Sequence, residues 1–132
     1  MPLATKNAPI VEEENLGDFK KFNLSQATQK NLISRGITAL FPVQYMTYER
    51  ILKREDLMVR DLTGSGKTLG FCLPIVEICR KERLFGGGKP LAMILAPTRE
   101  LAIQISKELE LLKHSPNEYN VLTVYGGVDI HG

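Results

Sequence analysis

The sequence has no long apolar segment, and this absence limits the class of protein. No run of apolar residues approaches the roughly 20 that are needed to cross a bilayer. The amino terminus also lacks the apolar core of a secretory signal peptide. We therefore expect an intracellular protein that does not insert into a membrane.

Cysteine is scarce, since only Cys72 and Cys79 occur in 132 residues. Both fall in one predicted helix, where a spacing of seven residues separates them by roughly 10 Å, beyond the reach of a disulfide. They form no C-x-x-C pair and have no nearby histidine, so we do not expect them to bind a metal. The sequence predicts that both are small buried hydrophobic side chains.

Excess charge of one sign is also nearly absent. The 17 basic and 15 acidic residues give a formal net charge of +2, which is too small to indicate nucleic-acid binding by itself. Any such binding must come from the placement of individual residues. A hydrophobic fraction of 43% and a charged fraction of 24% are ordinary for a globular protein, and the length predicts one domain or part of one.

What the sequence does contain is a glycine-rich phosphate loop at residues 61–68. It follows the apolar run 57–59 and precedes the apolar segment 69–78, which is the strand, loop and helix context that such a loop requires. Glycines let phosphate oxygens approach the backbone, and the following helix adds a favourable field. Lys67 is expected to reach the β- and γ-phosphates, and Thr68 to coordinate Mg²⁺. The expected nucleotide-binding residues are Asp61, Leu62, Thr63, Gly64, Ser65, Gly66, Lys67 and Thr68.

Further helices and strands are predicted on both sides of this loop. Ser25 is expected to cap a helix that Gly36 closes, and Pro42 to begin a second helix that ends near Arg54. The helix after the loop contains Pro74, which costs about 3 kcal/mol or more, so we expect a kink or an early end. Residues 91–96 and 120–125 predict two more strands. Between them a helix capped by Thr98 repeats its apolar residues on one face, at Leu101, Ile105, Leu109 and Leu112.

The order of these elements predicts an α/β fold. Strand, helix, strand, helix and strand in succession indicate a parallel sheet with helices on both faces, preceded here by an N-terminal helical region. Ligands of such sheets bind at the carboxyl ends of the strands, where residues 61–68 lie. Residues 1–15 end in an acidic run and are expected to form a flexible tail.

Together the motifs resemble the amino-terminal part of the first RecA-like domain of a DEAD-box ATP-dependent RNA helicase, over residues 16–132. Residues 36–44 look like the Q motif, within a region at 17–45, and Phe19 lies where the family places an isolated aromatic residue. Residues 63–68 match motif I, and residues 97–101 match motif Ia. The sequence Leu-Phe-Pro-Val-Gln at 40–44 is similar to that of the nucleolar Gu-type helicases, and this resemblance implies a location in the nucleus or nucleolus.

The resemblance implies ATP as the nucleotide, with Lys67 and Thr68 as catalytic residues. Gln44 presents one acceptor and two donors, which match the N6 donor and N7 acceptor of adenine and so favour ATP over GTP. Without the resemblance, we would expect Gln44 to be an exposed residue of a helix. The resemblance also places Phe19 near the adenine pocket and Ile37 beside the base, although in isolation Phe19 is equally consistent with a core anchor.

RNA is the implied partner, at motif Ia and at a glycine pair that follows it. Thr98 and the first N–H groups of its helix offer an anion site to which Arg99 adds donors, although Arg99 alone also reads as a solvated residue. Glycines at 126 and 127 let an RNA backbone approach the main chain. Such contacts are independent of sequence, so we expect RNA to bind by backbone and shape. The expected RNA-binding residues are Pro97, Thr98, Arg99, Glu100, Gly126 and Gly127.

Two features depart from the family pattern. Asp61 stands where the family has alanine, and a carboxylate about 4 Å from a phosphate charge is repelled by about 4 kcal/mol at an effective dielectric of about 20. We expect Asp61 to turn outward or to pair with Arg60, and to weaken nucleotide binding modestly. The second departure is that no acidic residue at another strand end is available to hold Mg²⁺. By the resemblance, the sequence ends before the Asp-Glu-Ala-Asp motif, so we expect a marginally stable part of an enzyme, with open sheet edges and no turnover alone.

Two alternatives stay open at this point. The chain is also compatible with another phosphate-loop NTPase, such as a GTPase or a kinase, although the Asn-Lys-x-Asp base reader of GTPases is missing. It is also compatible with a non-catalytic module that binds nucleotide, RNA or a partner protein without turnover. Competition between ATP and GTP separates the first alternative from the helicase hypothesis.

Overall fold

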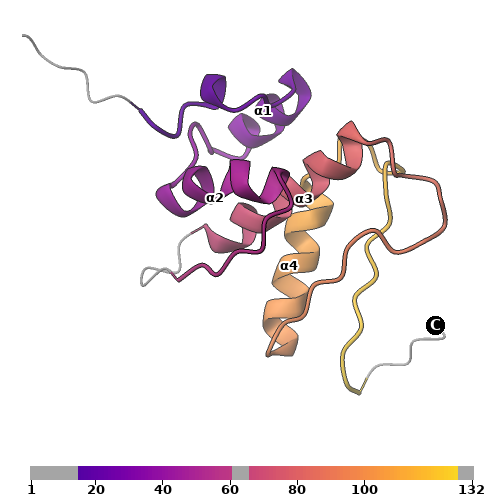
Figure 1. Cartoon of the computed structure of the whole chain (residues 1–132). Coiled ribbons are helices and arrows are strands. Elements are labelled where there is room, and N and C mark those ends of the chain that lie inside the picture. Colours follow the sequence, from indigo (N-terminus) through magenta and orange to yellow (C-terminus); the bar gives the residue numbers. More distant parts are fainter. Residues whose placement is uncertain (1–14, 61–65, 128–132) are drawn as a thin grey trace, which may run out of the picture.

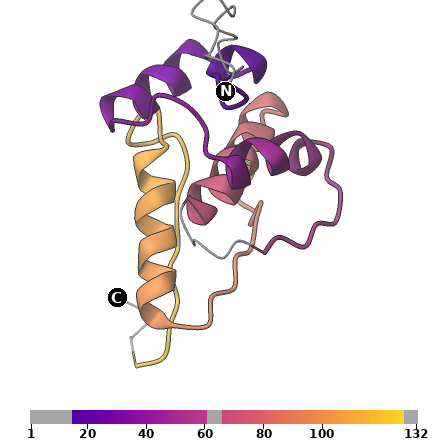
Figure 2. The same ribbon diagram turned by 90° about the vertical axis from the view of Figure 1, so that its left-hand side faces the viewer.

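The structure is a computed structural model, and it describes residues 15–60 and 66–127. In chain order these residues form a 3₁₀ helix η1 (Phe19–Lys21) and the helices α1 (Gln26–Ser34), α2 (Pro42–Leu52), α3 (Lys67–Lys81) and α4 (Arg99–Leu111). In Figures 1 and 2, α3 lies between α2 and α4, and α1 sits at one end of this group. The tail predicted at 1–15 lies outside the described residues except for its last position.

The ends of α1 and α2 agree with the predicted signals. Ser25 caps α1 because its hydroxyl accepts a hydrogen bond from the Thr28 N–H at 3.2 Å. Gly36 has a φ of +80°, and the next N–H, from Ile37, donates to the Leu32 carbonyl at 2.9 Å. This is the left-handed helix ending that favours glycine. Pro42 is the first residue of α2, as predicted, and the helix ends within two residues of the predicted position.

Helix α3 runs through Pro74 and continues to Lys81, so of the two predicted alternatives, a kink or an early end, the early end is excluded. Proline removes one backbone hydrogen bond from a helix, at a cost of about 3 kcal/mol or more. Pro74 and its neighbours Cys72 and Leu73 are fully buried, and this tertiary packing outweighs the local penalty. Cys72 and Cys79 are buried free thiols, which confirms their interpretation as small hydrophobic residues. Burial raises the pKa of Cys72 to about 12.

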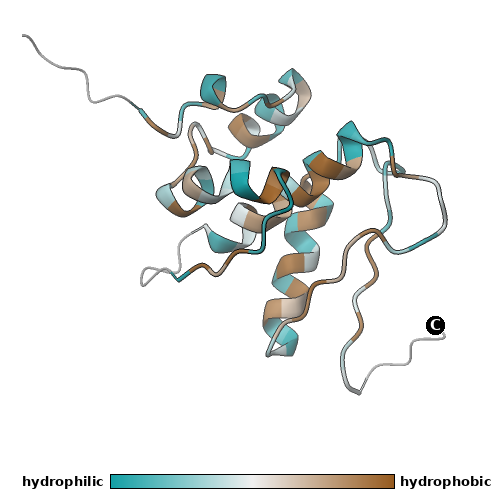
Figure 3. Ribbon diagram, viewed as in Figure 1, coloured by the Kyte–Doolittle hydropathy of each residue, from teal (hydrophilic) through white to brown (hydrophobic). Residues whose placement is uncertain are grey.

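One hydrophobic core joins the helices. In it, Phe22 and Tyr48 pack edge to face with their ring centroids 5.4 Å apart. The apolar stripe predicted for α4 is confirmed, since Ile105 and Leu112 are buried while Leu101 and Leu109 pack against them. Figure 3 shows hydrophobic residues, in brown, along the ribbons of α3 and α4. The buried members of the core are Phe19, Phe22, Leu24, Leu32, Leu40, Tyr48, Leu69, Cys72, Leu73, Val76, Ile105 and Leu112.

A buried polar network ties α1 to α3 and to the segment after α4. The Thr28 hydroxyl donates to the Glu77 carboxylate at 2.8 Å and lies 3.0 Å from His114 Nε2. The Arg80 guanidinium donates to Glu77 at 2.9 Å and to Glu118 at 2.6 Å. Burial and the Arg80 charge lower the pKa of His114, against the opposing effect of the two carboxylates. The network therefore favours a neutral imidazole.

The predicted parallel sheet is not formed among the described residues. Residues 55–60, 90–96 and 119–125 are extended, but no strand is assigned to them and no backbone hydrogen bond joins one segment to another. Figure 2 shows the last of these segments running along α4. The Thr123 hydroxyl donates to Ser106 at 2.8 Å, and Tyr119 donates to the Leu109 carbonyl, so the segment and the helix are antiparallel. The path of the chain is thus that of a strand–helix–strand unit, but the hydrogen bonds that would join two strands are not formed among these residues.

These extended segments nevertheless keep the period-two pattern of strands. Ile94 and Ala96 pack against the core, whereas the alternate residues Met93 and Leu95 are 82% and 88% exposed. A ladder also needs a neighbouring strand about 4.8 Å away, and a parallel sheet needs a covered second face. The described residues supply neither, which is why the pattern is present and the sheet is not. None of the helices in this described part is long and apolar enough to cross a membrane.

Candidate functional site

The first turn of α3 begins at a glycine that no other residue can replace without strain. Gly66 is the N-cap of α3 and has a φ of +78°. A Cβ atom at this position would lie 2.5 Å from Gln44 Nε2 and 3.0 Å from Phe41 Cδ2. Both the left-handed backbone and the lack of space require glycine. The end of the predicted phosphate loop therefore lies directly against the start of α2.

Gln44 connects these two elements. It is only 4% exposed, and its Nε2 donates to the Gly66 carbonyl at 3.1 Å. Its Oε1 accepts a hydrogen bond from the Phe41 N–H at 2.8 Å, which satisfies a free donor at the start of α2. An amide side chain has two N–H groups and two lone pairs, and these contacts use one of each. Gln44 therefore retains one donor and one acceptor for a ligand.

A cavity of about 240 Å³ lies at this junction. It is lined by Ile37 and Gln44, from residues 36–44, and by Gly66, Lys67 and Thr68, from the phosphate loop. These two motifs therefore lie close together, as the nucleotide-binding hypothesis requires. The amino-terminal end of α3 opens into it, which favours a bound anion. The lining residues are Arg35, Ile37, Phe41, Gln44, Gly66, Lys67, Thr68, Leu69, Gln104 and Glu108.

One wall of the cavity is an ion pair that the sequence did not reveal. Arg35, just after α1, donates from Nη2 to both carboxylate oxygens of Glu108 on α4, at 2.7 and 2.8 Å. The side chains are only 20% and 16% exposed, so the contact is shielded from water. The pair offsets the negative charge that Glu108 would otherwise present to a phosphate.

Five lining residues were not predicted from the sequence: Arg35, Phe41, Leu69, Gln104 and Glu108. For one of them a signal was available: Glu108 follows Leu101 by seven residues, so it shares the core-facing stripe of α4. A polar residue on such a stripe needs a partner or a pocket. No comparable local signal marks Arg35, because its partner is distant in the sequence.

The expected place of Phe19 near the adenine stays a prediction. Its side chain is 5% exposed and belongs to the hydrophobic core, and it is not among the residues that line the cavity. The segment is fixed by a backbone hydrogen bond from the Leu40 N–H to the Gly17 carbonyl at 2.8 Å. The geometry thus agrees with the alternative reading of Phe19 as a core anchor.

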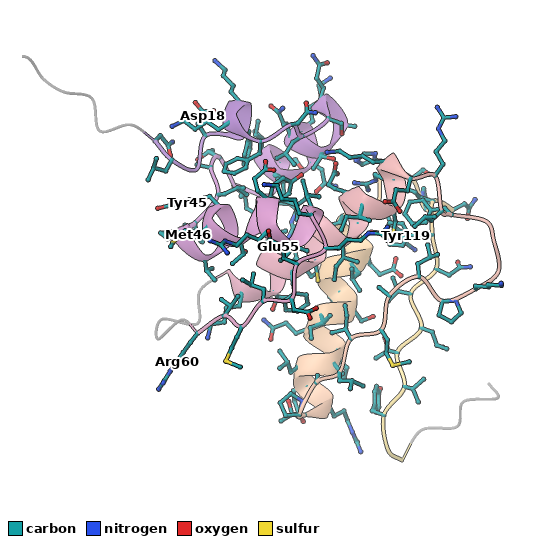
Figure 4. All side chains as sticks on the ribbon, viewed as in Figure 1. Asp18, Tyr45, Met46, Glu55, Arg60 and Tyr119 are labelled. Carbon is teal, nitrogen blue, oxygen red and sulfur yellow. The ribbon has the colours of Figure 1, made fainter. Side chains whose placement is uncertain are left out.

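Part of the phosphate loop lies outside the described residues. This applies to Asp61, Leu62, Thr63, Gly64 and Ser65, so their binding roles and the outward turn of Asp61 stay predictions. Arg60, the expected partner of Asp61, is exposed at the end of segment 55–60 and points away from the helices in Figure 4.

The residues predicted to contact RNA meet on one exposed surface at the start of α4. Thr98 caps the helix by accepting a hydrogen bond from the Leu101 N–H at 3.1 Å, as predicted. The Arg99 guanidinium donates to the Gly126 carbonyl at 2.6 Å and lies over the Tyr125 ring, 5.2 Å from its centroid. Pro97, Glu100, Gly126 and Gly127 are all exposed beside it. The structure thus brings motif Ia and the glycine pair together.

Comparison with known proteins gives a consistent result. The family model for DEAD/DEAH box helicases matches residues 41–131. Nucleolar RNA helicase 2-B of Xenopus laevis is 40% identical over 126 residues, which cover 93% of this chain and 15% of that protein. DEAD-box ATP-dependent RNA helicase 7 of Spinacia oleracea is 38% identical over 128 residues, covering 92% and 18%. ATP-dependent RNA helicase DDX50 of Homo sapiens is 36% identical over 120 residues, covering 89% and 16%. The chain thus spans less than a fifth of the length of these relatives.

Proposed function

Because this chain belongs to the DEAD/DEAH box helicase family, we propose that it forms the amino-terminal part of the nucleotide-binding domain of an ATP-dependent RNA helicase. The observation that carries the proposal is the hydrogen bond from Gln44 to the Gly66 carbonyl. It holds the candidate base reader against the loop that leads to Lys67 and Thr68. A purine triphosphate needs both parts within one cavity.

Each residue of the cavity has a distinct part in this proposal. Lys67 places a positive charge at the β- and γ-phosphates, and the Thr68 hydroxyl is a ligand for Mg²⁺. The free donor and acceptor of Gln44 match the N7 acceptor and N6 donor of adenine. Guanine presents two acceptors on the same edge, so the site selects ATP over GTP.

Titration of the chain with nucleotide in the presence of Mg²⁺ tests the proposal. We expect ATP to bind more tightly than GTP, and Lys67→Ala to weaken ATP binding by roughly tenfold or more, since hydrogen bonds to charged groups contribute about 1.5–3 kcal/mol. Lys81→Ala removes the same charge from the far end of α3 and is the matched control. Equal affinity of the chain for ATP and GTP, or equal effects of the two variants, would contradict the assignment.

We propose further that the exposed surface at the start of α4 contacts the RNA backbone. Thr98 and the adjacent N–H groups provide an anion site, and four of the five donors of Arg99 are still available beyond its bond to Gly126. Arg99→Ala should weaken binding to RNAs of different sequence by the same factor, and should lower the dependence of affinity on salt. Arg50→Ala, on the exposed part of α2, is the control with the same change in charge.

The described lining of the cavity contains one carboxylate, Glu108, and it is paired with Arg35. No acidic group in that lining is left to hold Mg²⁺ through water, so we propose that this chain alone binds ATP without turnover. Sustained phosphate release that RNA stimulates would contradict this. The relatives that are named nucleolar RNA helicases support the nucleolus as the compartment of the whole protein.

A further inference from the structure

Phe41 is the only aromatic residue in the described lining of the cavity, and we propose that it is the stacking platform for the nucleobase. This inference rests on the proposed function and adds a residue that contacts the face of the base. Gln44 reads the edge of the base by hydrogen bonds, but an edge contact leaves both faces of the purine uncovered. A purine buried in a protein is held by aromatic or apolar contact on its faces.

The position of Phe41 fits this role. Its side chain is 57% exposed although it is a large hydrophobic group, and it is not part of the hydrophobic core. Exposed aromatic area beside a cavity gains free energy when a ligand covers it. Phe19, the aromatic residue expected near the base, is 5% exposed and has no such free surface.

Phe41 also lies at the correct place relative to the polar groups. A Cβ atom built on Gly66 would meet both the Gln44 amide at 2.5 Å and the Phe41 ring at 3.0 Å, so ring and amide converge on the same point of the loop. A base whose edge meets Gln44 therefore has the Phe41 ring next to it. Ile37 and Leu69 add apolar surface to the same cavity.

The backbone of Phe41 is held before any ligand binds. It is the N-cap residue of α2, with φ −74° and ψ 161°, and its N–H donates to Gln44 Oε1 at 2.8 Å. The residue that reads the edge thus fixes the residue that covers the face. This arrangement lowers the ordering cost of binding, because only side-chain rotation is left to be restricted.

Comparison of two ligands, ATP and inorganic triphosphate, tests the proposal with the full chain and Mg²⁺. We expect Phe41→Ala to weaken ATP binding by about tenfold, which corresponds to about 1.4 kcal/mol and lies within the range for base stacking on an aromatic residue. Binding of inorganic triphosphate, which has no base, should not change. Phe41→Tyr should retain the wild-type affinity for both ligands. Met46→Ala, a change of an exposed hydrophobic residue on α2 outside the cavity (Figure 4), should leave both affinities unaltered.

The other outcomes overturn the proposal in distinguishable ways. If Phe41→Ala weakens both ligands equally, the residue supports the phosphate loop and does not contact the base. If it changes neither, or if wild-type chain binds ATP no more tightly than inorganic triphosphate, Phe41 does not stack on the base, while phosphate binding stands. If wild-type chain binds neither ligand, the proposed function fails and this inference fails with it. Circular dichroism of each variant verifies that the helices are retained.

Discussion

Replacing Gly66 with alanine should destabilise the chain more than the same replacement at any open left-handed glycine. Gly66 has a φ of +78°, and a non-glycine residue in this region costs about 1–2 kcal/mol. The added Cβ also meets Gln44 Nε2 at 2.5 Å, which forces the amide away from the Gly66 carbonyl. Loss of that hydrogen bond adds about 0.5–1.5 kcal/mol, so the total is about 1.5–3.5 kcal/mol.

Gly36→Ala is the matched control for this prediction. Gly36 has nearly the same φ, +80°, but a Cβ there would meet nothing within 4 Å. Its replacement should therefore cost only the backbone term of about 1–2 kcal/mol. The difference between the two variants isolates the contact between Gln44 and the end of the phosphate loop.

Urea unfolding, followed by circular dichroism, measures the two free energies of unfolding. Gly66→Ala should also lower the affinity for ATP, because Gln44 is displaced, whereas Gly36→Ala should not. Equal destabilisation by the two variants would refute the reasoning, since it would mean that Gln44 contributes nothing through Gly66. Loss of stability at Gly66 with unchanged ATP affinity would confirm the packing argument and refute the assignment of Gln44 to the nucleotide.

Three further predictions follow from other contacts. Removing either partner of the shielded pair Arg35–Glu108, by Arg35→Met or Glu108→Met, should lower the free energy of unfolding by about 1–3 kcal/mol. The double variant should lose less than the sum of the two single losses, which a double-mutant cycle in urea measures. Additive losses would show that the pair is not coupled. The pKa of His114 is lowered in the fold, so the unfolded chain binds the proton first as pH falls. The contribution of His114 to the free energy of unfolding should be complete above about pH 6.5 and decline below it. His114→Gln should remove this decline. Leu95→Lys and Leu122→Lys, at positions 88% and 85% exposed, should reduce aggregation in light scattering without lowering the free energy of unfolding.

The helix boundaries were predictable because their signals are local. Ser25 and Thr98 each cap a helix through an N–H three residues further along, and Gly36 ends α1 through contacts within five residues. Such contacts form in a short stretch whatever the rest of the chain does. Pro74 shows the limit of this reasoning. Its cost is local, but the burial that overrides it comes from residues of α2 and α4.

The sheet is the prediction that the described residues do not confirm. The reason lies in the non-local nature of strand pairing. The alternation of half-buried and exposed residues at 93–96 and 119–125 is a property of each segment alone. A hydrogen-bonded ladder is a property of two segments at once, and sequence periodicity does not show whether the second one is in register or present. The same argument explains Arg35, whose role depends on Glu108, a residue 73 positions away.

Phe19 and Phe41 show what the spacing of a motif leaves open. The spacing of an aromatic residue from a motif does not determine which aromatic ring faces the ligand. In this fold the Leu40 N–H donates to the Gly17 carbonyl, and Phe19, two residues after Gly17, is buried in the core. The ring next to Leu40 in the sequence, that of Phe41, is left at the cavity. A motif therefore indicates the kind of contact that a nucleobase needs, while packing decides which aromatic ring stays exposed.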